Sequence, residues 1–155
     1  MIYLTGDMHG DMTRFEEKGI KRLRRGDTLI VCGDFGFIWD GSPAEQKTLK
    51  KLAHKRFQIL FVEGCHDNLD LLSRYPLVDF GGGKAHKIAD NIYHLVRGGI
   101  FTVEGHKFFA FGGGGSVDHD MRELGKTWWE EEMPTPDEME AGRQNLALQD
   151  NRVEF

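Results

Sequence analysis

The chain has 155 residues, enough for one domain with a hydrophobic core, and its apolar and charged fractions of 39% and 29% are ordinary for a soluble globular protein. The net charge of −5 argues against a general nucleic-acid binder. No segment is apolar enough to span a membrane, the opening MIYLTGDMHGD does not have the pattern of a signal peptide, and two cysteines cannot build a disulfide scaffold. These features favour a cytoplasmic protein.

The first part of the chain alternates between apolar runs and helical patterns. Strands are predicted over Ile2–Thr5, residues 29–32 and residues 59–62, and a glycine follows each of them. A helix is predicted from Pro43 to about His54, because Ser42 can cap it and Glu45 lies three residues after the cap. Strands that alternate with helices predict an α/β domain.

Another helix is predicted between the first two strands. Thr13-x-x-Glu16 can form a capping box, and Gly26 can end the helix. The basic residues Lys18 and Lys21–Arg25 would then form its solvated face.

The second part of the chain predicts a different arrangement. Three short apolar runs at Ile92–Val96, Ile100–Val103 and Phe108–Phe111 are typical of an antiparallel meander, and a further helix starts after Thr135. Residues 152–155 alternate like the opening of a strand. No repeat or linker is evident, so residues 1–155 are interpreted as a single domain.

Polar side chains follow each of the three early strands. The strands end in Asp7-Met8-His9, in Gly33-Asp34 and in Gly64-Cys65-His66-Asp67. In a parallel α/β sheet, ligands bind beyond the carboxyl ends of the strands, so these side chains are expected to converge.

Two kinds of chemistry fit these residues. Mixed carboxylate and imidazole ligands suit manganese, iron or zinc, and a bridging carboxylate can hold the two metals of a phosphoryl-transfer site. The rival is a nucleophilic Cys65. It is disfavoured because neighbouring side chains in extended backbone point apart, which would leave His9 as the only base for Cys65.

The three motifs, in this order and spacing, resemble those of the calcineurin-like metallophosphoesterases, and residues 111–138 resemble a bacterial and prophage branch of that family. The resemblance implies an αββα sandwich with mixed sheets. It also implies that Asp7 and His9 bind one metal, that Asp34 bridges two, and that position 65 binds the second. His66 would be the general acid and Asp67 would orient it, while a metal-bound hydroxide attacks phosphorus directly.

Two departures from the family pattern bear on these expectations. The family usually has asparagine where this chain has Cys65, and it completes its metal shell with later histidines after C-terminal strands that have no counterpart here. The chain is therefore interpreted as a family member that lacks its last strands. The alternative function is a catalytically impaired fragment or binding module with a partial metal site.

Other residues give weaker signals. His54, His86, His94 and His106 are interpreted as surface residues, and His119 is the best substitute ligand, although a solvated loop is favoured there. Gly112–Gly115 lacks the lysine of a phosphate-binding P-loop and is interpreted as a tight passage near the site. Arg122 could contact a substrate phosphate, and Trp128 and Trp129 could form a lid or cover the core edge.

The function expected from the sequence is hydrolysis of a phosphate monoester or diester with two divalent metal ions, manganese first and zinc or iron as alternatives. The expected partner is a small phosphorylated substrate or a nucleotide. Nucleic acid is expected only as a substrate, and no membrane is expected.

Overall fold

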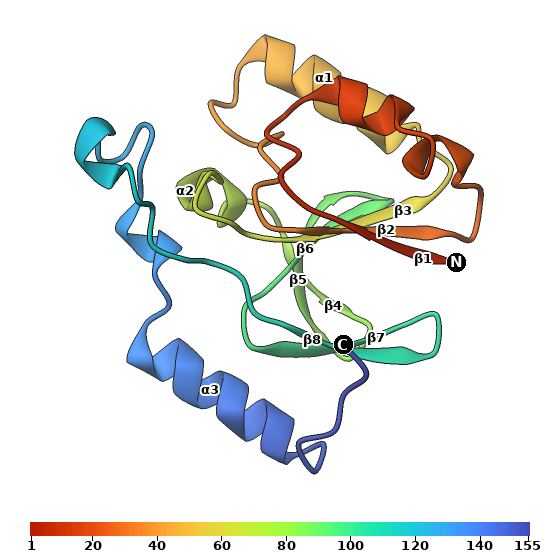
Figure 1. Ribbon diagram of the computed structural model, residues 1–155, viewed down its shortest axis with the longest axis vertical. Coiled ribbons are helices and arrows are strands. Elements are labelled where there is room, and N and C mark those ends of the chain that lie inside the picture. The colour runs from red at the N-terminus through yellow and green to blue at the C-terminus, as the bar shows by residue number, and fades with distance from the viewer.

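In the computed structural model, which describes residues 1–155, two β-sheets pack against each other between helices (Figure 1). The larger sheet has the strand order β1-β2-β3-β6-β5-β4. Its strands are β1 (Ile2–Thr5), β2 (Thr28–Cys32), β3 (Gln58–Val62), β4 (Leu77–Phe80), β5 (Gly83–Ala89) and β6 (Ile92–Leu95). Strands β1, β2, β3 and β6 run parallel, whereas β5 pairs antiparallel with β6 and β4 antiparallel with β5.

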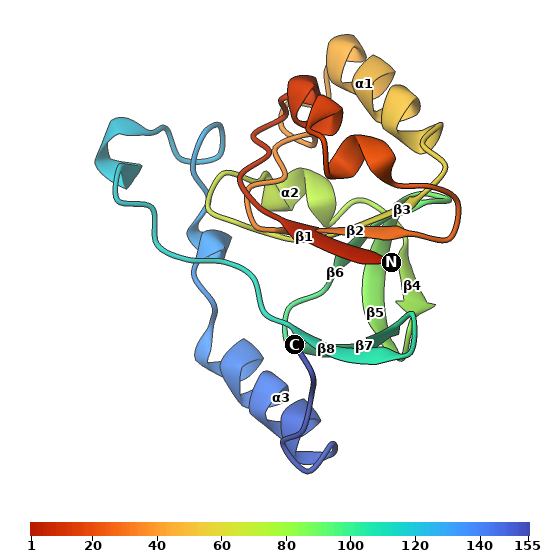
Figure 2. The same cartoon turned by 45° about the vertical axis from the view of Figure 1, so that its right-hand side comes forward.

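The second sheet is a hairpin of β7 (Gly99–Val103) and β8 (His106–Ala110). Helix α3 (Pro136–Ala147) covers its outer side, and α1 (Pro43–Ala53) and the short α2 (Leu69–Leu72) lie on the opposite side of the larger sheet (Figures 1 and 2). The layers are helix, sheet, sheet and helix, which confirms the predicted α/β sandwich of the metallophosphoesterase type. No helix of the structure has the length and apolar character needed to cross a membrane.

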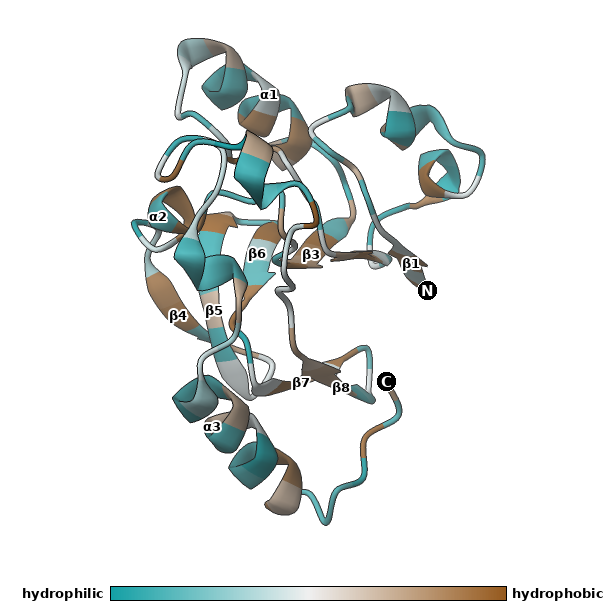
Figure 3. Ribbon diagram, turned by 60° about the vertical axis from the view of Figure 1, so that its left-hand side comes forward, coloured by the Kyte–Doolittle hydropathy of each residue, from teal (hydrophilic) through white to brown (hydrophobic).

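Two apolar clusters hold these layers together. The larger cluster lies between the six-stranded sheet and its helices and includes Phe15, Phe35 and Phe61. The smaller one, with Leu60 and Phe101 at its centre, lies between the two sheets. Strands β2 and β3 are buried on both faces, as their continuous apolar runs predict, and Figure 3 shows β3 and β4 as largely hydrophobic. Both clusters anchor the strands whose ends carry the polar loops.

The helix predicted between Thr13 and Gly26 is wrong. Two short 3₁₀ helices, Met12–Glu16 and Ile20–Arg22, occupy that region, and Asp11 caps the first one by accepting a hydrogen bond from Thr13 N at 2.8 Å. The predicted capping box does not form because Asp11 is the N-cap, and the Thr13 hydroxyl donates to the Asp11 carboxylate at 2.8 Å. The basic residues around Lys21 are exposed, as predicted, but only Lys21 and Arg22 lie on a helix, the short 3₁₀ helix, and the others lie on turns and connecting segments.

The predicted meander is also wrong. Strand β6 belongs to the larger sheet and pairs parallel with β3, whereas β7 pairs only with β8. Strands β4 and β5 were not predicted. An apolar run shows that a strand is buried, but it does not show which sheet the strand joins.

The predicted helices after Ser42 and Thr135 are confirmed, and the second carries a complete capping box of Thr135 and Glu138. The residues predicted to open a strand at Arg152 do not form one. They run beside β8, where Phe109 N donates to Phe155 O at 2.8 Å and Phe155 N donates to Lys107 O at 3.2 Å.

Candidate metal centre

The loops after β1 and β2 are joined by backbone hydrogen bonds. His9 N donates to Asp34 O at 2.9 Å, and Gly10 N donates to Phe35 O at 3.1 Å. Gly10 and Gly36 touch closely, since a Cβ on Gly10 would lie 2.7 Å from Gly36 O. Only glycine fits such a close approach of two backbones.

The proposed ligands on these loops have an uncommon backbone conformation. Six non-glycine residues have positive φ, and three of them are Asp7, His9 and Asp34, with φ of 50°, 47° and 52°. Positive φ is energetically unfavourable for residues with a Cβ and is enriched at functional sites. This conformation turns the side chains of His9 and Asp34 towards the same point.

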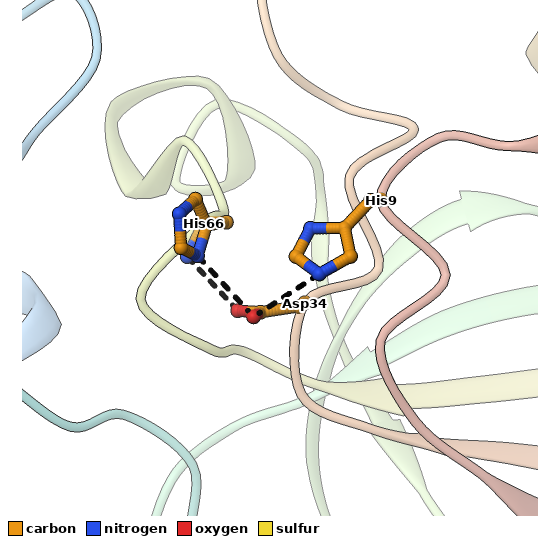
Figure 4. A group of neighbouring side chains, drawn as sticks. All are labelled: His9, Asp34 and His66. Carbon is orange, nitrogen blue, oxygen red and sulfur yellow. Dashed lines mark hydrogen bonds and ion pairs between the residues drawn. The ribbon is translucent and has the colours of Figure 1, made fainter. Parts of the chain in front are cut away.

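Asp34 lies at the centre of the site. Its side chain is 13% exposed, and its Oδ1 accepts a hydrogen bond from His66 N at 2.9 Å. Its Oδ2 lies 3.3 Å from His66 Nδ1 and 3.7 Å from His9 Nε2. Figure 4 shows both imidazole rings directed at this carboxylate. A Cβ on Gly64 would come within 2.0 Å of Asp34 Oδ1, so Gly64 is required for the contact.

His9, Asp34 and His66 can hold a metal ion, because one ligand atom from each residue lies within 4.8 Å of the others. Two imidazoles and one carboxylate form a donor set that suits zinc, iron or manganese. The residues present therefore fit a divalent cation. Asp7 lies at the edge, with Oδ1 4.0 Å from His9 Nε2 and a side chain that is 79% exposed.

Cys65 lies beside the group of three. Its Sγ is 3.2 Å from His66 Nδ1, and Asp7, Asp34 and Cys65 line the same hollow of 370 Å³. The prediction that the Cys65 and His66 side chains point apart is wrong, because the backbone turns at these residues and is not extended. Burial and the charge of Asp34 raise the pKa of the Cys65 thiol, which is the opposite of what activates a nucleophilic cysteine.

Asp67 holds the loops in place. The residue is buried, and its carboxylate accepts hydrogen bonds from Phe35 N at 3.2 Å, Gly36 N at 2.7 Å and Gly64 N at 2.9 Å. Burial raises the pKa of Asp67, and these three donors act in the opposite direction. The hydrogen bonds of its carboxylate all come from backbone N–H groups, and none comes from the His66 ring that Asp67 was predicted to orient.

A segment that we call the cover segment, residues 112–133, lies beside the three loops (Figures 1 and 2). It begins at Gly112, where a Cβ would lie 2.5 Å from Glu63 O, and Gly113 packs as closely against Glu132 O, whereas a Cβ on Gly114 would meet open space. The predicted tight passage is therefore confirmed at Gly112 and Gly113 and is wrong at Gly114. Ser116 N and Ser116 Oγ each donate to the buried Glu132 carboxylate at 2.7 Å. Trp129 is buried and packs edge-on against Trp39 with ring centroids 5.2 Å apart.

Arg122 joins the cover segment to the strand-end loop that carries Cys65 and His66. Its side chain is only 7% exposed, and its guanidinium lies against His66 Nε2, donates to Cys65 O at 3.0 Å and pairs with Asp118 Oδ1 at 3.0 Å. Because a guanidinium only donates, His66 Nε2 accepts in this arrangement. The sequence indicated Arg122 only weakly, and His119 is exposed and lies outside the group of three.

A buried charge network lies behind the site. Glu63 Oε2 accepts from His94 Nε2 at 2.8 Å, and Glu63 Oε1 accepts from Arg97 Nε at 2.6 Å. Arg97 also donates to Glu138 Oε2 at 3.0 Å and to Glu131 O at 3.1 Å. Burial favours the protonated form of Glu63, but His94 and Arg97 outweigh this effect and lower its pKa.

The prediction that His94 is a surface residue is wrong. It is 4% exposed, and its ring stacks on His86, which is half-buried. The sequence carried no sign of this, because a histidine in a central strand resembles one in an edge strand until its partners are known. His54 and His106 are exposed, as predicted.

The chain was compared with known proteins. A family model described as calcineurin-like phosphoesterase matches residues 1–154. No curated protein and no solved structure matches the chain.

Proposed function

The chain belongs to the calcineurin-like phosphoesterase family, and we propose that it hydrolyses a phosphate monoester or diester with the help of two divalent cations, manganese first. The observation that carries this proposal is the convergence of His9, Asp34 and His66 after three parallel strands. Bound cations would supply Lewis-acid charge and activate water.

Each residue is given a role that its position supports. Asp34 would bridge the two cations, because both of its oxygens face ligand-bearing loops. Asp7 and His9 would complete the first cation's shell, and Cys65 would contribute to the second, since it lines the hollow beside Asp34. Asp67 would keep the loops in register through its three N–H contacts.

His66 would deliver the proton to the leaving oxygen. Its Nδ1 faces Asp34, and its Nε2 faces Arg122. Nε2 carries no proton while it accepts from Arg122, so the guanidinium has to turn away and Nε2 has to take up a proton from solvent before it can donate one to a leaving oxygen. A substrate phosphate is a suitable new partner for that guanidinium. Arg122 would thus connect substrate binding to the freeing of His66.

A second function is supported by the same geometry. Three ligand atoms within 4.8 Å suffice for one cation, while Asp7 is largely exposed. A binding module that holds one cation and does not hydrolyse phosphoesters would have this arrangement. The two free cysteines accord with a reducing compartment such as the cytoplasm in either case.

One experiment separates the two functions. The protein is equilibrated with manganese, zinc or iron, its metal content is measured, and hydrolysis of p-nitrophenyl phosphate and bis-p-nitrophenyl phosphate is followed. Two ions per chain with hydrolysis support the phosphoesterase. One ion without hydrolysis of either compound supports the binding module.

A matched pair of variants controls this experiment. His9→Ala removes a proposed ligand, whereas His54→Ala removes an exposed histidine at the end of α1. Loss of metal in His9→Ala alone ties binding to the site. Equal metal content in both variants would contradict the assignment of His9.

A further inference from the structure

A hollow lined by arginines lies far from the metal centre. It has a volume of 760 Å³ and is lined by Leu23, Arg24, Arg25 and Arg56, without any acidic residue. Arg24 and Arg25 precede β2, and Arg56 precedes β3, so the hollow lies at the amino ends of the parallel strands. The metal-binding loops lie at the opposite edge of the sheet (Figures 1 and 2). We call these four residues the arginine hollow.

The three guanidinium groups of the arginine hollow have no partner in the protein. None of them takes part in a side-chain hydrogen bond or an ion pair. The carboxylates nearby are already engaged, since Asp27 binds the terminal ammonium and Arg24 N, and Glu16 pairs with Lys21. Three like charges around one hollow repel each other, and a bound anion would relieve that repulsion.

In contrast to the three arginines of the hollow, most basic side chains in the later part of the chain form ion pairs. Carboxylates pair with most of the basic side chains after residue 56, namely Lys84, Lys87, Arg97, Arg122, Lys126 and Arg143. Residues 1–56 contain 11 Lys and Arg against 8 Asp and Glu, whereas residues 57–155 contain 9 against 17. Residues 1–56 therefore carry a net positive charge, although the net charge of the whole chain is −5.

We propose that the arginine hollow binds the phosphates of a nucleic-acid duplex and serves as a docking surface remote from the metal centre. Arginine matches phosphate because its planar guanidinium can donate two parallel hydrogen bonds. Arg22, next to Leu23 in the chain, is also exposed and has no carboxylate partner. The only apolar lining residue, Leu23, is 9% exposed, so the surface offers no side chain for a bilayer or for an apolar protein pocket.

This inference goes beyond the proposed function and does not depend on it. It revises the expectation that nucleic acid is at most a substrate, because a duplex on this surface would lie away from the metal centre. Contacts of this kind read phosphate and not base sequence, so the binding would be independent of sequence and sensitive to salt.

The test measures fluorescence anisotropy of labelled DNA and RNA duplexes with the full chain at about 50 to 200 mM salt. The variant Arg24→Gln/Arg25→Gln/Arg56→Gln removes the charges of the hollow. The matched control Arg74→Gln/Arg143→Gln/Arg152→Gln removes the same charge from exposed positions elsewhere. Each lost phosphate contact should lower the slope of log K against log salt by about 0.9 for a DNA duplex.

The expected result is that the wild type and the control variant bind duplexes with the same salt slope, while the hollow variant binds at least about tenfold more weakly with a slope lower by about three. Melting temperature and metal content should be equal in all three proteins. Single variants of each arginine, with a slope change of about one, keep the test decisive if the triple variant unfolds.

Three results would overturn the proposal. The first is an absence of salt-dependent duplex binding by the wild type. The second is an equal loss of binding in the hollow and control variants, which would indicate net charge alone. The third is preferential binding to anionic lipid vesicles over duplexes, which would assign the surface to a membrane. None of these results bears on phosphoester hydrolysis.

Discussion

The three strand-end loops and the cover segment build the site in different ways. In the loops, the backbone positions the side chains, through positive φ at His9 and Asp34 and through N–H to C=O bonds between neighbouring loops. The cover segment instead contacts the loops through a long side chain, since Arg122 donates to the backbone of Cys65, 57 positions earlier in the chain. The comparison teaches that the side chains of the candidate site are positioned by local backbone, whereas the contacts above them depend on a few side chains.

The largest effect is expected from a substitution in the strand-end loops. Asp34→Asn keeps the shape of the side chain and its bond from His66 N, but a neutral amide cannot bridge two cations as a carboxylate does. Hydrolysis should fall to the uncatalysed background and metal affinity should drop sharply, measured by nitrophenyl phosphate turnover and metal content. Asp40→Asn, at an exposed position, is the control. Full activity of Asp34→Asn with manganese would disprove the dinuclear assignment.

The next effect concerns the residue where the two regions meet. His66→Ala should slow hydrolysis by about 10²–10⁴-fold, the usual contribution of a general acid, and leave metal content nearly intact. The loss should shrink for substrates with good leaving groups such as nitrophenol.

Two outcomes argue against the general-acid role of His66. An equal loss for good and poor leaving groups would remove it. A loss of metal would show that His66 is a ligand, as its place in the group of three permits.

The buried network of Glu63, His94 and Arg97 also contacts the cover segment, because Arg97 donates to Glu131 O. Removing the charge of Arg97 tests how much this network stabilises the fold. Arg97→Met leaves Glu63 buried without its guanidinium partner, and breaking a buried pair in this way costs about 3–5 kcal/mol. Urea unfolding measures the loss. Arg143→Met breaks the exposed pair with Glu140 and should cost less than about 1 kcal/mol. Equal costs for the two variants would show that the network does not stabilise the fold.

A smaller effect is expected in the metal preference of the loops. A soft thiolate at position 65 favours zinc, whereas the asparagine oxygen usual in the family suits manganese. Cys65→Asn should therefore raise the ratio of manganese to zinc after equilibration with both metals, measured by metal analysis. Cys32→Asn, in the same hollow, is the control. Identical ratios in the wild type and Cys65→Asn would show that this cysteine does not touch the metal.

The smallest expected effect is a pH dependence of stability from the histidines behind the site. Burial, with a smaller contribution from the charge of His94, lowers the pKa of His86. The unfolded chain gains a proton on His86 as pH falls below about 6.5, and the folded chain resists it. The free energy of unfolding should therefore fall as pH drops from about 7 to 5, and His86→Gln should reduce that slope. His54→Gln should leave the slope unchanged, and an unchanged slope in His86→Gln would exclude this origin.

The same comparison explains what could be predicted from the sequence. Parallel strands, their glycines and the polar residues beyond them are encoded within a few residues of each other, so β1, β2 and β3 and the convergence of His9, Asp34 and His66 were predicted. The pairing of β6 with β3 and the contacts of Glu63 with Arg97 depend on which distant elements meet. Such contacts leave no periodic or local pattern, so β4, β5 and the buried His94 were missed.

The close contact of Gly10 with Gly36 limits how this protein can diverge. A side chain at either glycine would collide with the backbone of the other loop, and Asp67 ties the third loop to the same backbone. Insertions in these loops would separate the ligands, so relatives that act on other substrates should keep them at constant length. Between Val117 and Lys126, every side chain of the cover segment except those of Asp118 and Arg122 is exposed, and only Arg122 is tied to the three loops. Variation in substrate range is therefore expected to concentrate at these exposed positions, which makes them the natural place to exchange sequence when redesigning specificity, with Asp118 and Arg122 kept.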